Sequence, residues 1–159
     1  MIKFSILILT SFLFSANVKA VQPAVTKKFQ KELTKHFDGE SIITKENKML
    51  SNDNDLFMDI YKGNEKLGIV VLTAAKGRYD KFDYMIVYDL NCKVDLIKIL
   101  VYRSDYGAEI TAKRWLSQFY IKKEDSLKYG SDIQAISGAT FSAISLTKNV
   151  NRINKILKE

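Results

Sequence analysis

Apolar residues recur at the period of a helix near the start of the chain. Between Pro23 and Phe37 they stand four residues apart, at Val25, Phe29, Leu33 and Phe37. This spacing predicts an amphipathic helix over residues 23–37. Pro23 suits the first turn of a helix, and Asp38-Gly39 supplies a stop signal. We expect the apolar face of this helix to cover a sheet.

The middle of the chain carries four short apolar runs that predict β-strands. They are rich in valine, isoleucine and tyrosine, and they cover residues 56–61, 67–73, 84–88 and 94–102. A short strand at Ile42-Ile43 is expected before them. The turn signal Gly63-Asn64 separates the first pair of runs, and residues 89–93 separate the second pair. Each pair is therefore predicted to form an antiparallel hairpin.

The last of these runs is largely apolar on both faces. Ile97, Ile99 and Val101 alternate with Leu96, Leu100 and Tyr102. Because two apolar faces must both be covered, we expect this strand at the centre of the sheet, with helices or a ligand on either side.

A second helical period starts just after Thr140 and runs nearly to the C-terminus. Its apolar residues follow at spacings of three and four: Ala143, Leu146, Val150, Ile153 and Leu157. In a shorter helical stretch, residues 111–119, Trp115 and Phe119 stand four residues apart and are expected in the core. Strands followed by a helix, in a chain of 159 residues, predict a single α+β domain with an antiparallel sheet packed by helices.

Residues 1–20 have the composition of a secretory signal peptide. Lys3 is followed by an apolar run from Phe4 to Ala16 and by the small-x-small site Val18-Lys19-Ala20. The run is short for a membrane span, which needs about 20 residues. We expect an exported protein, periplasmic or at the cell surface, and keep an uncleaved membrane anchor as the alternative. The expected divisions are 1–20 as signal segment, 21–55 as helix and connector, and 56–159 as the main domain.

The formal net charge of +7 changes this picture little. The lysines are spread along the chain and interleaved with acids, which favours solubility and weak attraction to acidic lipid, and we expect no nucleic acid partner. Cys92 and His36 are the only residues of their types. A single cysteine excludes an intrachain disulfide, and one cysteine with one histidine argues against a zinc site. A serine hydrolase built on Ser137 or Ser142 would have only His36 as its base.

Candidate chemistry gathers in the residues just before the last helix. Ser137, Gly138 and Ala139 are small, and Gly138 adopts a positive φ angle at low cost. The first turn of the following helix offers unpaired N–H groups, a site for an anion such as phosphate, and Thr140 places a hydroxyl there. The same residues also suit an ordinary helix N-cap.

The run Ser137-Gly138-Ala139-Thr140 resembles the flavinylation motif of the FMN-binding domain family. That family includes the periplasmic flavin subunits of sodium-pumping NADH:quinone oxidoreductases and related ferredoxin:NAD oxidoreductases. In it, a flavin transferase attaches FMN through its phosphate to the last threonine of a Ser/Thr-Gly-Ala-Thr run, which corresponds to Thr140. The resemblance spans about Leu56 to Leu157. It implies an FMN-binding domain over residues 56–159, acting in electron transfer with a membrane or periplasmic redox partner.

A second segment is similar to the same family. Tyr106-Gly107-Ala108-Glu109 stands where a variant of the family reads Tyr-Gly-x-Glu, and Gln118-Phe119 matches the end of the helix that follows. The resemblance implies that Tyr106, Gly107 and Glu109 flank the flavin ring. Residues 74–82 are loosely similar to a Gly/Tyr-rich family segment, and both a plain surface loop and a flavin-contacting loop stay open for them.

The family pattern is broken at one position before the motif. It commonly has an aspartate three residues before the Ser/Thr of the run, where this chain has Gln134, and Asp132 lies two residues earlier. Two alternatives follow from this difference. The chain carries FMN covalently on Thr140, or it is a non-covalent FMN-binding or flavin-free interaction module of the same fold. Whether the chain is an enzyme stays open, and an electron-carrier domain is favoured over an independent enzyme.

Overall fold

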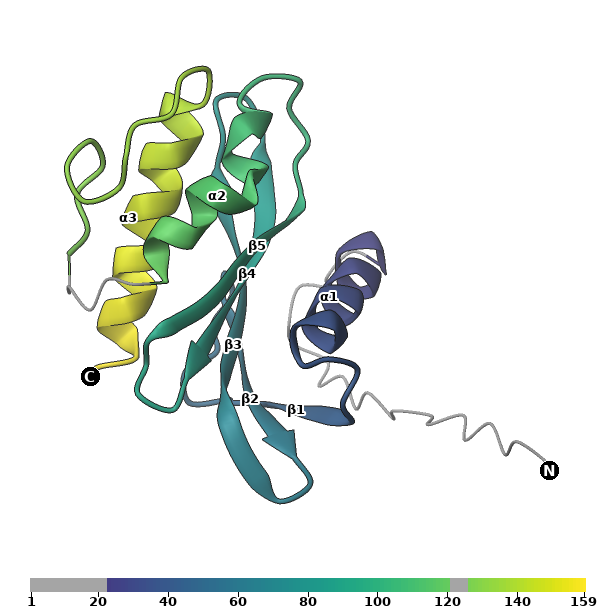
Figure 1. Cartoon of the computed structure of the whole chain (residues 1–159). Helices are drawn as coiled ribbons and strands as arrows, with labels where there is room; N and C mark the ends of the chain where they lie inside the picture. The colour runs from purple at the N-terminus through teal and green to yellow at the C-terminus, as the bar shows by residue number, and fades with distance from the viewer. Residues whose placement is uncertain (1–22, 121–125) are drawn as a thin grey trace.

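The computed structural model describes residues 23–120 and 126–159. Over these ranges the chain forms a five-stranded antiparallel sheet with helices on both faces, which is the α+β fold predicted from the sequence (Figure 1). The predicted signal segment, residues 1–20, lies outside the described residues. No helix within the described ranges is both long and apolar enough to cross a membrane.

The strands follow one another across the sheet in sequence order. Their bounds are β1 Ile42–Glu46, β2 Leu56–Lys62, β3 Glu65–Lys76, β4 Lys81–Asp89 and β5 Val94–Val101. Each pairs antiparallel with its neighbour, which confirms both predicted hairpins. β3 and β4 also form a hairpin, because both strands extend into the 74–82 segment and pair as far as Lys76 and Lys81.

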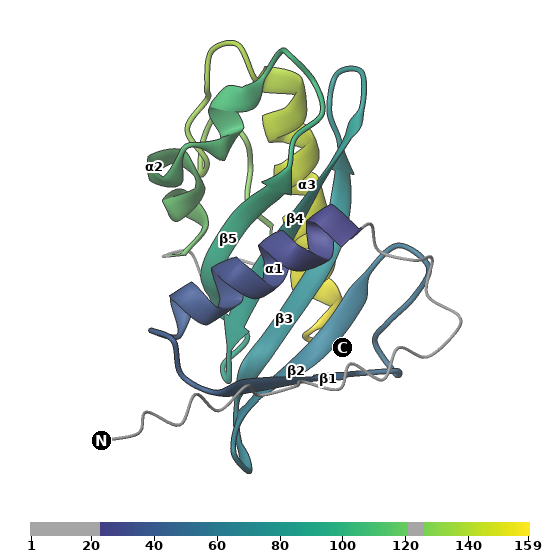
Figure 2. The same cartoon turned by 90° about the vertical axis from the view of Figure 1, so that its right-hand side faces the viewer.

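The sheet separates two apolar layers (Figure 2). On one face lies α1, Pro23–His36, with Val25, Phe29 and Leu33 buried against strand residues. The other face carries η1 Ala108–Thr111, α2 Lys113–Leu116, η2 Ser117–Phe119 and α3 Thr140–Ile156. Since strand side chains alternate between faces, Ile99 joins the α3 layer and Leu100 the α1 layer.

The prediction that β5 is central is wrong, because β5 lies at the edge of the sheet. Its two apolar faces are explained by helices on both sides, α1 on one and α2 with η2 on the other. The Tyr120 hydroxyl lies 3.3 Å from both the backbone nitrogen and the carbonyl oxygen of Ile97. A side chain therefore satisfies these two backbone groups of the edge strand, where another strand would otherwise pair.

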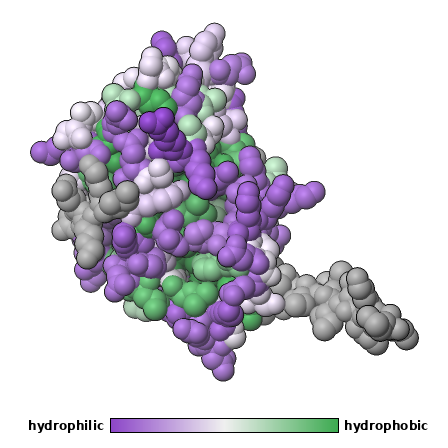
Figure 3. Space-filling model, viewed as in Figure 1, coloured by the Kyte–Doolittle hydropathy of each residue, from purple (hydrophilic) through white to green (hydrophobic). Residues whose placement is uncertain are grey.

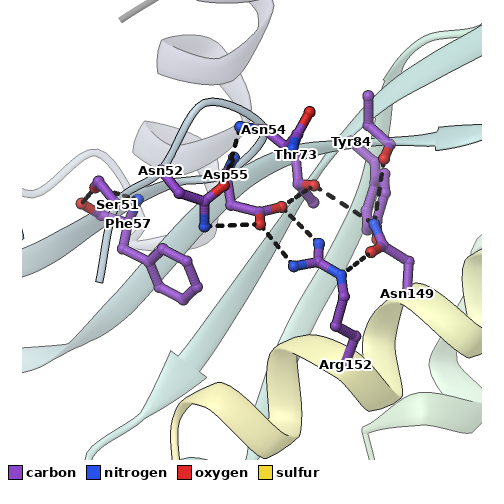
Figure 4. A network of polar contacts seen from close by, with 10 residues as sticks. Ser51, Asn52, Asn54, Asp55, Phe57, Thr73, Tyr84, Asn149 and Arg152 are labelled. Atoms are coloured by element: carbon purple, nitrogen blue, oxygen red, sulfur yellow. Dashed lines mark hydrogen bonds and ion pairs between the residues drawn. The ribbon is translucent and has the colours of Figure 1, made fainter. Parts of the chain in front are cut away.

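A polar network fastens α3 to the sheet (Figure 4). Asp55 is 1% exposed, and both of its carboxylate oxygens accept hydrogen bonds of 2.7 Å from the Arg152 guanidinium. The Thr73 hydroxyl donates a further bond of 2.6 Å to Asp55. Asn149 accepts from Arg152 at 2.8 Å and donates to the Tyr84 hydroxyl at 2.7 Å. Burial alone would raise the pKa of Asp55, but the bonds from Arg152 and Thr73 outweigh it and hold that pKa below its usual value.

Asp55 is buried and Arg152 is partly exposed, so we expect the loss of either charged group to lower the stability of the fold by a different amount. Arg152→Met would leave the Asp55 carboxylate buried without its cation, and we expect it to lower the free energy of unfolding by about 3–5 kcal/mol. Asp55→Asn should cost less, about 1–3 kcal/mol, because the Arg152 side chain is 44% exposed and can return to water. Urea unfolding at pH 7 measures both, with Lys148→Met on the exposed surface of α3 as the control. An equal loss in both variants would contradict this ranking.

The lowered pKa of Asp55 also predicts a dependence on pH. A carboxyl group whose pKa is depressed by folding stabilises the folded state above its unfolded pKa of about 3.9, and this contribution is lost as the pH falls through the folded pKa. Between about pH 5 and pH 2 the parent protein should therefore lose more stability than Asp55→Asn. Parallel stability profiles for the two proteins would show that Asp55 is not the titrating group.

Candidate functional site

The predicted motif lies at the N-terminus of α3, which begins at Thr140. The N-cap residue is Ala139, with no side-chain cap, and the helix has no acidic residue in its first turn. The first hydrogen bond back along the helix runs from the Ala143 N–H to the Ala139 carbonyl, at 2.9 Å. Helix geometry therefore leaves the N–H groups of residues 140–142 without acceptors inside the helix, at its positive end. Thr140 is exposed beside them.

The loop containing Tyr106–Glu109 packs against this helix start. Gly107 has φ +85°, and a Cβ added there would lie 3.6 Å from the Cα of Ala139. Gly138 has φ +82°, and its Cβ would lie 2.8 Å from a Glu109 carboxylate oxygen. Both glycines have a left-handed backbone that suits a residue without a side chain, and the two distances show that each lies close to the other segment. The two segments singled out from the sequence meet through these two contacts.

A buried serine links the same loop to α3. The Tyr102 hydroxyl donates to the Tyr106 carbonyl at 2.8 Å and lies 3.0 Å from the Ser142 hydroxyl. Ser142 is buried in the first turn of α3, and a Cβ on Gly107 would come within 2.6 Å of the Tyr102 oxygen. No local pattern in the sequence indicates this link, because Tyr102 and Ser142 are 40 residues apart.

The residues before the motif are held by α2 and η2. The Trp115 indole N–H donates to the Gln134 carbonyl at 2.8 Å, and the Gln118 side-chain oxygen accepts from the Gln134 N–H at 2.7 Å. Trp115 is buried, as predicted. These two hydrogen bonds hold the backbone of Gln134, and because the residue is exposed its side chain faces water. The Asp132 carboxylate accepts from the Lys128 N–H at 2.8 Å and is thus engaged in the preceding turn.

Exposed aromatic side chains gather at this end of the molecule. Tyr79, in the β3–β4 turn, and Tyr106 are 64% and 66% exposed, with ring centroids 6.2 Å apart. Phe141, directly after Thr140, is 53% exposed. Adjacent exposed aromatic rings such as Tyr79 and Tyr106 offer an apolar surface to a ligand or a partner, whereas a singly exposed residue such as Phe141 is ordinary. The sequence left the 74–82 segment open, and the fold brings its Tyr79 next to Tyr106.

The fold argues against a serine hydrolase, because His36, the proposed base, lies far from the candidate serines. His36 ends α1, and its Nε2 atom lies 2.7 Å from an Asp95 carboxylate oxygen. α1 covers the opposite face of the sheet from α3 (Figure 2). His36 therefore does not approach Ser142, or Ser137 just before α3.

No protein-family model matches the chain, and no curated protein matches it significantly.

The two constraints on Gly107 predict that Gly107→Ala destabilises the protein. The left-handed backbone alone should cost about 1–2 kcal/mol, and the contact with Tyr102 should add to it. Gly130→Ala is the matched control, because Gly130 has a similar φ of +89° and nothing within 4 Å of an added Cβ. Chemical unfolding of the two variants measures the difference. Equal losses would mean that the loop moves away from Tyr102 without cost.

Proposed function

We propose that this chain is an exported flavoprotein that carries FMN on Thr140 through a phosphoester bond and acts in electron transfer. The observation that supports this most is the packing of the Tyr106–Glu109 loop against the Ser137–Thr140 run. Two segments that separately resemble an FMN-binding domain are adjacent in space, at the start of a long helix.

Attachment uses groups that the helix start provides. The Thr140 oxygen would form the new bond to phosphorus, and its proton would pass to a base of the flavin transferase. The activated donor would be a flavin dinucleotide, whose anhydride bond would break and release a nucleoside monophosphate. The backbone N–H groups of residues 140–142 offset the remaining negative charge of the phosphate. Gly138 is exposed and has no side chain, and the Glu109 carboxylate beside it is also exposed and would have to turn away for the phosphate to approach.

The flavin ring would lie among the aromatic residues near Thr140. Tyr79 and Tyr106 offer flat, largely apolar surfaces, which suit a cofactor site with few polar groups. When bound, FMN supplies the chemistry of taking up one or two electrons, and the protein supplies position and electrostatics. Electron transfer needs no general acid or base from the chain, so the proposed role is an electron carrier for a membrane or periplasmic redox partner.

The second candidate is a module of the same fold that binds FMN without a covalent bond or has no flavin. Gln134 in place of the family's aspartate favours it. Asp132 is a poor substitute for that carboxylate, because it already accepts a hydrogen bond in the turn that starts at Lys128.

Thr140→Ala should abolish covalent flavin in protein coexpressed with a flavin transferase. Intact mass then lacks the increment of one FMN, and the denatured chain shows no flavin fluorescence on a gel. Thr34→Ala, which removes an exposed threonine hydroxyl of α1 on the opposite face of the sheet, is the matched control and should keep its flavin. Flavin that stays on the Thr140→Ala chain would disprove the assignment. Flavin that leaves the parent chain on denaturation would support the second candidate.

Gln134→Asp should raise the rate of covalent loading by restoring the family's carboxylate. The fold should tolerate the change, because the contacts of Gln134 with Trp115 and Gln118 use its backbone. The time course of flavin incorporation by mass spectrometry measures the effect, with Gln134→Asn as the uncharged control. Equal rates for all three proteins would show that attachment does not depend on this position.

A further inference from the structure

The solvent face of α1 carries a line of positive charge that the core does not require. We call it the lysine stripe: Lys27, Lys28, Lys31 and Lys35. All four side chains are exposed, whereas the buried residues Val25, Phe29 and Leu33 point to the sheet. At 100° per residue the stripe falls within a sector of about 100° opposite the buried face.

The stripe has few acidic neighbours among the described residues of α1. The one acidic residue of α1, Glu32, lies beside the sheet and pairs with Lys98 on β5 at 3.6 Å. No ion pair joins a stripe lysine to an acid within residues 23–120 and 126–159. Lysines four residues apart, such as Lys27 and Lys31, repel each other on a helix. An external polyanion would relieve this repulsion.

The surface around the stripe offers charge rather than apolar contact. Beside the stripe, the exposed residues of α1 are Pro23, Ala24, Gln30 and Thr34, none of which is large and apolar. Figure 3 has α1 at its right-hand side and does not face the stripe, but on the face that it draws hydrophilic residues also dominate. This surface therefore does not favour a partner that inserts apolar groups. It favours a partner with a flat anionic surface.

We propose that the lysine stripe docks α1 on an anionic lipid bilayer. The position of α1 in the chain favours lipid over other polyanions. Its first residue, Pro23, follows the apolar run that ends at Ala16 by seven residues, which span about 25 Å at most. Retained as an anchor, that run would hold α1 at the membrane surface, and an apolar anchor with a basic helix gives stable attachment where either alone is weak. If the apolar run is cleaved off, the lysine stripe alone makes the contact with the membrane.

Docking in this way orients the candidate flavin site. α1 and α3 cover opposite faces of the sheet, so a bilayer against α1 leaves α3 facing water (Figure 2). A redox partner would then reach Thr140 from the aqueous side. The docking itself does not depend on flavin.

The test compares binding of the full chain to two kinds of vesicle. One contains phosphatidylcholine with a third of phosphatidylglycerol, and the other contains phosphatidylcholine alone. The ratio of the two partition coefficients isolates the effect of charge, because any contribution of the apolar N-terminal run appears in both. Each lysine near an anionic surface is worth about fivefold. We expect a ratio above about tenfold for the parent protein, falling steeply in 0.5 M salt.

A variant with all four stripe lysines changed to glutamine should lower this ratio at least tenfold. The matched control changes four exposed lysines on the α2 and α3 side to glutamine: Lys113, Lys128, Lys148 and Lys155. It removes the same charge and should lower the ratio less than threefold. If the two variants lower the ratio equally, the proposal is wrong, because net charge alone would then explain binding to the anionic vesicles. A ratio near one for the parent protein would overturn it altogether, whatever its flavin content.

Discussion

The position of α3 on the sheet is the constraint on which both the core and the candidate site depend. Arg152 and Asp55 fix the second half of the helix, and Ser142 with Tyr102 fixes its first turn. A shift of one residue along the helix means a rise of 1.5 Å and a rotation of about 100°. Such a shift would turn Arg152 away from the Asp55 carboxylate. Because Asp55 is buried, no other cation could reach it. The polar network therefore sets where Thr140 lies.

Most of the fold could be predicted from the sequence because its signals are local. α1 and α3 repeat apolar residues at helical spacing, and Gly63-Asn64 marks the turn of a hairpin. The placement of β5 could not be predicted in this way. Two apolar faces indicate cover on both sides, and a central strand and an edge strand between helices satisfy that condition equally. The side chain that occupies the edge, Tyr120, is 23 residues from Ile97.

The site was predictable only as two separate segments. Ser137–Thr140 and Tyr106–Glu109 each carry a recognisable run of residues, and each glycine in them signals a special backbone. Their meeting depends on pairs far apart in sequence, such as Gln118 with Gln134 and Tyr102 with Ser142. No spacing rule connects such pairs. Tyr79 joins the site for the same reason, through a hairpin whose turn places it near Tyr106.

The charge beside the motif bears on how a flavin would be held there. A Glu109 carboxylate lies next to Gly138, close to the helix end that would receive the phosphate. A free FMN phosphate is a monoester with a charge of about −1.5 to −2 at pH 7, like the phosphate of a modified serine. Bonded to Thr140 it becomes a diester with one negative charge. Coulomb repulsion from Glu109 scales with that charge, so it falls by about a third to a half on attachment. At this position Glu109 therefore repels a free FMN phosphate more than an attached one, and Glu109→Gln would reduce both repulsions.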